Sequence, residues 1–162
     1  MAEAAGPSDL IQQCALAGEL NKEDCEILGA VAELRSLEAG EVLFEESQVD
    51  DSVHIVISGK LAVTKQTGGG ADTILHIIQD GDLAGEMGFV DGTPHSATVK
   101  AVTPSQVVSL HRGKFESLLD SHPRVVYDVM RAIIRRVHGT LRRMNFQYVE
   151  MTNYITRTHG RY

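Results

Sequence analysis

The fold is decided by the stretch GDLAGEMGFV (residues 81–90), followed after a short break by TPHSATV (residues 93–99). Two glycines three residues apart, Gly85 and Gly88, bracket a Glu-Met pair. Glycine lets a backbone turn tightly and approach a ligand without a Cβ in the way. A short turn here leaves several N–H groups unpaired, and such groups suit an anion. The spacing therefore marks residues 81–99 as a candidate anion-binding loop.

Polar groups on both sides of this loop could hold a ligand. Glu86 is an acceptor suited to a sugar hydroxyl. The hydroxyl of Ser96, together with the amides of Ser96 and Ala97, could close on a phosphate from the other side. Glycine spacing alone favours a different interpretation, in which these residues form a surface turn between two strands.

The same stretch resembles the phosphate-binding cassette of the cyclic-nucleotide-binding domain family, the kind of effector domain found in catabolite activator proteins. The family pattern is Gly-Glu, an apolar residue, a short helical turn, then Pro-Arg-Ser/Ala-Ala-Thr and a strand. Five positions match it: Gly85, Glu86, Ser96, Ala97 and Thr98. One position departs from it, because His95 stands where the family carries its phosphate-binding arginine.

Local periodicity predicts helices at the start of the chain. A short helical pattern begins at Ser8, and Asn21 is a good N-cap for a second helix with acidic residues in its first turn. We expect the second helix to end around Arg35. It presents four apolar residues toward a core at three-residue steps: Cys25, Leu28, Val31 and Leu34.

The hydrophobic period then changes from helical to alternating. Six β-branched runs are separated by glycine-containing turns: 42–44, 53–57, 61–63, 74–78, 97–99 and 107–110. Many short strands of this kind are typical of a β-sandwich or rolled sheet. Gly40 and Gly59 match glycines at the corners of the family's β-roll, and the resemblance covers residues 8–144. We expect an α+β fold: an antiparallel β-roll (double-stranded β-helix or jelly roll) with N-terminal helices and a long C-terminal dimerisation helix.

The last helix is expected to start at Pro123 and to carry a heptad seam of about four repeats. The apolar residues of the seam alternate steps of three and four: Tyr127, Met130, Ile134, Val137, Leu141, Met144, Tyr148, Met151 and Ile155. Such a helix extends roughly 50 Å, too far to be buried whole against a small roll, so we expect a parallel dimer. The alternative, a helix folded back on its own domain, leaves residues 141–155 unexplained and fits four others: Val125, Val126, Val129 and Ile133.

These elements divide the chain in two. Residues 8–123 form the expected cyclic-nucleotide-binding β-roll with flanking helices, and residues 124–156 form the dimerisation helix. Relatives that regulate transcription continue past this helix into a helix-turn-helix domain. The chain ends soon after Met151, so we expect no DNA-binding domain in it. It is either a stand-alone sensor or part of a longer protein.

Charge is distributed unevenly along the chain. The net charge is −7, yet residues 124–162 hold eight arginines against Asp128 and Glu150, a net of +6 that leaves −13 for the remainder. A basic helix suits nucleic acid or an acidic partner. A solvated helix face is the alternative, and a mostly acidic body argues against general DNA affinity.

Several features favour a cytoplasmic protein without a membrane partner. No apolar run approaches the length needed to cross a bilayer, and the opening residues MAEAAGP have neither the basic nor the apolar region of a signal peptide. Cys14 and Cys25 both lie in apolar, helix-like surroundings. We expect two reduced, buried thiols rather than a disulfide or a metal pair.

Residues for catalysis are missing from the sequence. The seven histidines are scattered without the close spacing of a metal site, and no Gly-Lys-Ser/Thr loop or nucleophile elbow is present. A cupin would share the β-roll but needs clustered His and Glu on facing strands. We therefore expect no metal, no cofactor and no enzymatic activity. His54 and His76 are expected at the edge of the core or on the surface.

Two functions stay open. The resemblance implies a dimeric regulatory domain that senses cAMP or cGMP and changes its dimer or partner state, acting on an unknown effector protein. It implies these ligand-binding residues, with Thr140 at the purine: Gly85, Glu86, Met87, His95, Ser96, Ala97 and Thr140. The alternative is a degenerate, ligand-independent dimerisation or docking module, or a sensor of a different ligand. His95 discriminates between them, because histidine cannot copy the fixed charge and bidentate fork of arginine.

Overall fold

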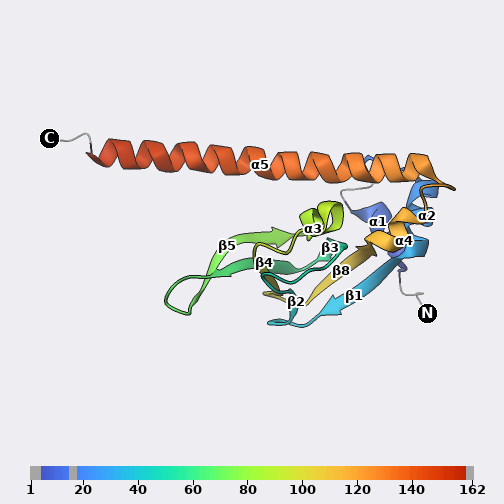
Figure 1. The fold of residues 1–162 in the computed structure, drawn as a ribbon, viewed down its shortest axis with the longest axis horizontal. Coiled ribbons are helices and arrows are strands. Elements are labelled where there is room, and N and C mark those ends of the chain that lie inside the picture. Colours follow the sequence, from blue (N-terminus) through green and yellow to red (C-terminus); the bar gives the residue numbers. More distant parts are fainter. Residues whose placement is uncertain (1–4, 15–17, 160–162) are drawn as a thin grey trace.

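A computed structural model describes residues 5–14 and 18–159. Helices α1 (Pro7–Gln13) and α2 (Lys22–Val31) come first, strands follow, and α5 (Pro123–His159) is last. Figure 1 shows α5 lying along one side of the strands, with α1, α2 and α4 (Arg112–Glu116) under its first part. The hairpin of β4 (Lys60–Gln66) and β5 (Asp72–Gln79) reaches out below the later part of α5.

The strands form two antiparallel sheets, which confirms the predicted β-roll. One sheet has the order β1-β8-β3-β6 and the other β2-β7-β4-β5. The first sheet consists of β1 (Ala32–Leu37), β8 (Ser105–His111), β3 (Ser52–Ser58) and β6 (Leu83–Ala84). The second consists of β2 (Val42–Phe44), β7 (Thr98–Ala101), β4 (Lys60–Gln66) and β5 (Asp72–Gln79). All six β-branched runs of the sequence lie in strands, except that Ala97 comes just before β7, since such side chains pack well on a pleated, half-buried surface.

Apolar side chains fill two layers, and β3 separates them. One cluster, which includes Val56 and Phe44, lies between the sheets. The other joins Val53 and Ile55 to the helices, including Val129 of α5. Because successive strand residues point to opposite faces, β3 is buried on both sides. His54, which lies between Val53 and Ile55 on this strand, is therefore also buried.

The start of the first sheet differs from the prediction. The second helix ends at Val31, and residues 32–37, of which 32–35 were expected to be helical, form β1 instead. β1 pairs with β8 from Ala32 opposite Leu110 to Leu37 opposite Ser105. This pairing overrides the helical spacing and leaves Leu34 exposed. The predicted N-cap is confirmed, because the Asn21 side chain accepts a hydrogen bond of 2.8 Å from the Asp24 amide.

The two cysteines lie in and beside the N-terminal helices as thiols. Cys25 is buried, as predicted, in the outer core, the apolar cluster between the first sheet and the helices, and burial raises its pKa. Cys14 is only half-buried. Among the described residues, no helix is both long enough and apolar enough to cross a bilayer.

Helix α5 has two kinds of apolar surface. Its first turns pack on the roll through Val125, Val129 and Ile133. These residues are among the four expected from the sequence to fit packing of the helix on its own domain. The predicted seam begins partly buried, since Met130 and Val137 also touch this core. From Leu141 to the end of the described helix, all side chains for which exposure is described are exposed. With 37 residues the helix extends roughly 55 Å, and none of the described residues buries its later half.

Two glycines at corners of the roll should differ sharply in their tolerance of a side chain. Gly59 has φ +94°, and an added Cβ would lie 2.2 Å from Ser105 Oγ. Gly40 has φ +87°, with nothing within 4 Å of an added Cβ. We expect Gly40→Ala to cost about 1–2 kcal/mol from backbone conformation alone, and Gly59→Ala to cost at least about 1 kcal/mol more from overpacking. Urea unfolding measures both, and equal losses would contradict the difference.

Candidate functional site

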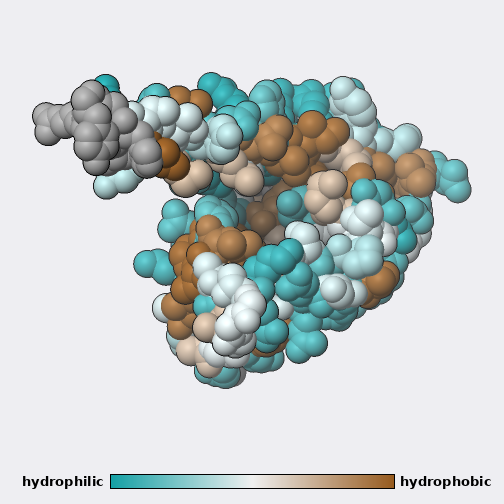
Figure 2. Space-filling view, turned by 60° about the vertical axis from the view of Figure 1, so that its left-hand side comes forward, coloured by the Kyte–Doolittle hydropathy of each residue, from teal (hydrophilic) through white to brown (hydrophobic). Residues whose placement is uncertain are grey.

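A cleft with a volume of about 1010 Å³ lies between the roll and α5. Figure 2 shows the hollow under the projecting helix, with hydrophobic surface on the helix above it and on the roll below it. The loop predicted from the sequence forms one wall, apolar residues of β4 and β5 form a second, and α5 closes the cleft from the other side. The cleft thus joins segments that lie far apart in the sequence.

The predicted loop contains a short helix that packs tightly against the start of β3. Gly85, with φ +78°, caps α3 (Glu86–Asp91), and Gly92, with φ +73°, ends it. A Cβ on Gly85 would lie 2.8 Å from the Ser52 carbonyl oxygen, and one on Gly88 would lie 2.6 Å from the Asp50 carbonyl oxygen. Such distances leave no room for a side chain, so both glycines are required by the close approach of two backbones. The segment is not a simple surface turn.

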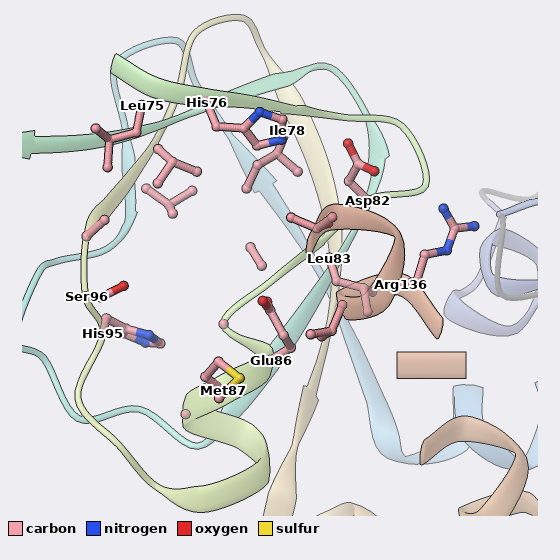
Figure 3. A pocket seen from close by; sticks show the side chains of 18 of the residues that line it. Leu75, His76, Ile78, Asp82, Leu83, Glu86, Met87, His95, Ser96 and Arg136 are labelled. Atoms are coloured by element: carbon pink, nitrogen blue, oxygen red, sulfur yellow. The ribbon is translucent and has the colours of Figure 1, made fainter. Parts of the chain in front are cut away.

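All seven residues predicted for ligand binding line this one cleft. Six come from the loop and the start of the next strand, and Thr140 faces them from α5. Figure 3 shows the labelled Glu86, His95 and Ser96 around the same space, with the Glu86 carboxylate directed into it. The cleft therefore combines backbone amides, a carboxylate, a hydroxyl and an imidazole. These groups suit a ligand that has both hydroxyl and anionic groups.

Glu86 is a half-buried residue whose carboxyl is partly shielded from water. Burial raises its pKa, and a backbone hydrogen bond and the nearby His95 oppose this effect only in part. Water is a better solvent for a carboxylate than the protein interior. A ligand hydroxyl that donates a hydrogen bond to Glu86 would replace part of the lost hydration.

His95 is held from behind by the roll. Its side chain is 5% exposed, and its ring stacks on Phe44 with centroids 3.7 Å apart. Its Nε2 lies 3.6 Å from Oδ2 of Asp50. The backbone is fixed too, because the His95 amide donates to the Gln48 carbonyl at 3.0 Å and the Ser47 amide donates to the His95 carbonyl at 2.8 Å.

A second histidine meets the same carboxylate. Nε2 of His54 lies 3.5 Å from Asp50 Oδ2, and its Nδ1 lies 2.8 Å from the hydroxyl oxygen of Ser109. The expectation that His54 lies at the edge of the core or on the surface is wrong, because β3 is covered on both faces. His54 and the Ser52 amide hold the pKa of Asp50 well below its usual range. His76, by contrast, is half-buried on the cleft wall.

Residues that sequence reasoning missed line the cleft from two sides. The roll contributes an apolar wall that includes Leu75, Ile78 and Leu83. Helix α5 contributes Arg136 and Arg143, which share a helix face with Thr140 because the three residues are four and three positions apart. That spacing is visible in the sequence and could have revealed the cationic face. Within residues 5–14 and 18–159, no group of three His, Cys, Asp or Glu side chains could hold a metal ion.

Three further arginines of α5 pair with carboxylates of the chain, and one of them, Arg135, also lines the cleft. Arg131 and Arg135 both pair with Glu19, which precedes α2, and Arg124 pairs with Asp128 at 3.0 Å. In the described part of the chain, no carboxylate lies within 4.0 Å of Arg136 or Arg143. The helix wall of the cleft therefore carries positive charge, at Arg136 and Arg143, that no described carboxylate neutralises.

The burial of Glu86 predicts how the ligand-free fold responds to pH. Because its pKa is raised in the folded state, Glu86 makes the fold less stable as pH rises from the unfolded-state value through the folded-state value. Glu86→Gln should therefore raise the Tm of the ligand-free protein at pH 7, and the gain should shrink toward pH 4. Differential scanning calorimetry checks this, with the exposed Glu116→Gln as control. A lower Tm for Glu86→Gln at pH 7 would contradict the role of burial.

Comparison with known proteins supports the resemblance. A family model described as cyclic nucleotide-binding domain matches residues 34–122, more than half of the chain. Neuropathy target esterase sws of Drosophila erecta is 26% identical over 135 residues, which cover 78% of this chain and 9% of that protein. A CRP-like cAMP-activated global transcriptional regulator of Mycobacterium tuberculosis is 27% identical over 101 residues, which cover 62% of this chain and 45% of that protein. The chain thus spans a small part of the first relative and less than half of the second.

Solved structures share the fold. A cyclic nucleotide-binding domain from Methylobacillus flagellatus has a TM-score of 0.78 at 19% identity, covering 90% of this chain and 82% of that chain. The N-terminal domain of a transcriptional regulator from Streptomyces coelicolor has a TM-score of 0.70 at 27% identity, covering 84% of this chain and 95% of that chain. On the strength of the family match over residues 34–122, this chain belongs to the cyclic nucleotide-binding domain family.

Proposed function

We propose that this protein is a regulatory domain that binds cAMP or cGMP in the cleft and changes its dimer or partner state on binding. One observation carries the proposal: the seven residues implied for ligand binding, six from the loop and Thr140 opposite them, all line a single cleft. The Mycobacterium tuberculosis relative is named as cAMP-activated, which supports a cyclic nucleotide as ligand. The effector protein that receives the signal is unknown.

Each part of a cyclic nucleotide has a matching group in the cleft. Glu86 and the Gly85 backbone would hold the ribose 2′-hydroxyl. Ser96 and the amides near Met87 and Ala97 would hold the cyclic phosphate. Thr140 would meet the base, and the apolar wall of the roll suits the flat faces of a purine. No chemical step is needed for this role, and none of these residues is assigned to catalysis.

A second candidate function is a degenerate docking module that needs no ligand. His95 favours it, because a neutral imidazole gives one ordinary hydrogen bond where arginine gives a charged fork. Charged hydrogen bonds contribute about 1.5–3 kcal/mol, so the loss of one weakens binding by roughly ten- to a hundredfold. The remaining amides and Glu86 argue for the first candidate.

Calorimetric titration with cAMP and with cGMP tests the proposal and the part played by His95. The phosphodiester is an anion that favours imidazolium, so affinity should rise as pH falls from about 8 to about 6. Because burial raises the pKa of Glu86, the gain should reverse at lower pH, where that carboxyl takes up a proton.

Two variants separate charge from shape at this position. His95→Arg should bind about tenfold or more tightly and lose most of the dependence on pH. His95→Gln should also lose the dependence but bind weakly. An affinity that does not change between pH 8 and pH 6 would show that His95 does not contact the phosphate. No heat and no thermal shift at millimolar ligand would end the cyclic-nucleotide proposal in favour of the docking module.

The exposed seam on α5 supports the dimer. Leu141 is 55% exposed, and Met144, Tyr148 and Met151 continue the stripe along the uncovered part of the helix. Exposed apolar residues at heptad spacing are typical of helices that pair. We therefore keep the division into a roll, residues 8–123, and a dimerisation helix, residues 124–156, as part of the proposal.

A charge on the seam should separate the subunits. Leu141→Asp should give monomers in sedimentation experiments, because burying two facing carboxylates at the interface costs several kcal/mol. Phe146→Asp is the matched control: Phe146 is equally apolar and 65% exposed but lies off the seam. A dimer that persists in Leu141→Asp, or that is lost only in Phe146→Asp, would place the interface elsewhere.

A further inference from the structure

We propose that Asp50 positions His95 and provides the negative charge against which His95 acts as the cation for the ligand phosphate. An aspartate–histidine pair would then take the place of a single arginine. The inference rests on the proposed function, because it requires an anionic ligand in the cleft. It assigns a role to Asp50, which does not line the cleft.

Three groups from separate segments meet behind the cleft. Asp50 precedes β3, His54 lies on β3, and His95 lies in the loop that follows α3. Oδ2 of Asp50 is 3.5 Å from His54 Nε2 and 3.6 Å from His95 Nε2. Both imidazole side chains are 5% exposed and the Asp50 side chain is 21% exposed. Water therefore has little access to this cluster.

The chemistry of the cluster selects one tautomer of each histidine. An ionised carboxylate only accepts hydrogen bonds, so the nitrogen facing it must carry the proton. Within the described residues, neither Nε2 has a hydrogen-bond partner, and the Asp50 carboxylate is the charged group that each one faces. The Ser52 amide donates to the other carboxylate oxygen, Oδ1, at 2.9 Å. Asp50 is thus oriented by backbone and shared by two rings.

The two histidines differ at their second nitrogen. Nδ1 of His54 is bonded to Ser109 Oγ, so this ring is occupied at both ends. Nδ1 of His95 makes no hydrogen bond to any described residue, and His95 lines the cleft. His95 Nδ1 is therefore the atom available to a ligand. Its lone pair would take a proton from solvent when a phosphate oxygen approaches.

The charges around His95 favour that protonation once an anion is bound. The charged or titratable groups that face the ring are Asp50 from the segment before β3, His54 from β3 and Glu86 from α3. Phe44 covers one face without charge. An imidazolium would donate from Nε2 to Asp50 and from Nδ1 to the phosphate, with an anion at each end. Without Asp50, the cation would have to be buried with one partner only.

Asp50 is also tied mechanically to the loop. The backbone around His95 is hydrogen-bonded to Ser47 and Gln48, just before Asp50. Gly88 packs against the Asp50 carbonyl, where an added Cβ would come within 2.6 Å. The carboxylate and the ring that it orients therefore belong to one packed unit. Asp50 is a positioning residue, since it does not touch the ligand itself.

Asp50→Asn tests the charge while keeping the shape of the side chain. Titrations with cAMP and cGMP at pH 6, 7 and 8, in buffers of different ionisation enthalpy, give both affinity and proton uptake. We expect the unmodified protein to take up close to one proton on binding at pH 8. Asp50→Asn should bind about tenfold more weakly at pH 7 and take up fewer protons, with its gain in affinity shifted to lower pH.

The adjacent carboxylate provides the matched control. Asp51 pairs with His111 and Arg112, at 3.7 Å and 3.4 Å, and Asp51→Asn should keep the affinity and proton uptake of the unmodified protein. An Asp50→Asn variant with an unchanged pH profile would overturn this inference and leave the proposed function intact. Absence of binding by the unmodified protein would overturn both.

A measurement on the unmodified protein covers the case in which Asp50→Asn fails to fold. Nitrogen NMR of the histidine rings, with His95 assigned by comparison with His95→Gln, reports which nitrogen carries the proton. We expect Nε2 alone to be protonated in the ligand-free protein at pH 8 and both nitrogens in the complex. A ligand-free His95 protonated only at Nδ1 would overturn the pairing with Asp50.

Discussion

The site depends on one close approach of two backbones, where the Gly85–Gly88 turn lies against residues 50–52. Added Cβ atoms would come within 2.8 Å and 2.6 Å of carbonyl oxygens there, so only glycine allows this packing. The approach fixes the start of α3 beside Glu86 and brings the loop that follows it back over β2. His95 is then pressed onto Phe44 and toward Asp50. The positions of the polar groups that the loop contributes to the cleft thus follow from the absence of side chains at Gly85 and Gly88.

Helix α5 links the core to the cleft. Its first turns fill the outer core with Val125, Val129 and Ile133, and the next turns carry the polar wall at Arg136, Thr140 and Arg143. One continuous element therefore contributes both to the packing of the roll and to the shape of the cleft. The positive charge of this helix is used unevenly, since Glu19 neutralises Arg131 and Arg135 while Arg136 and Arg143 pair with no described carboxylate.

The sequence was informative where one local rule dominated and misleading where two rules competed. Runs of β-branched residues predicted strands correctly, and the glycine pair together with the family resemblance predicted the loop. Leu28, Val31 and Leu34 are spaced as in a helix, but pairing with β8 converts the last of them to a strand residue. The burial of His54 and its meeting with Asp50 depend on both faces of β3 being covered. That is a tertiary property, and no spacing within the strand shows it.

The length of α5 has a mechanical consequence. The helix is unbroken from Pro123 to His159, and Thr140 lies near its middle, so the 19 residues that follow Thr140 extend roughly 28 Å from it. A tilt of about 5° at the cleft, caused by a ligand that draws the helix toward the loop, would move the far end by roughly 2–3 Å. A displacement of that size is enough to change which side chains at the C-terminal end of α5 could contact a partner. A small tilt of α5 at the cleft would thus become a larger displacement at the far end of the helix.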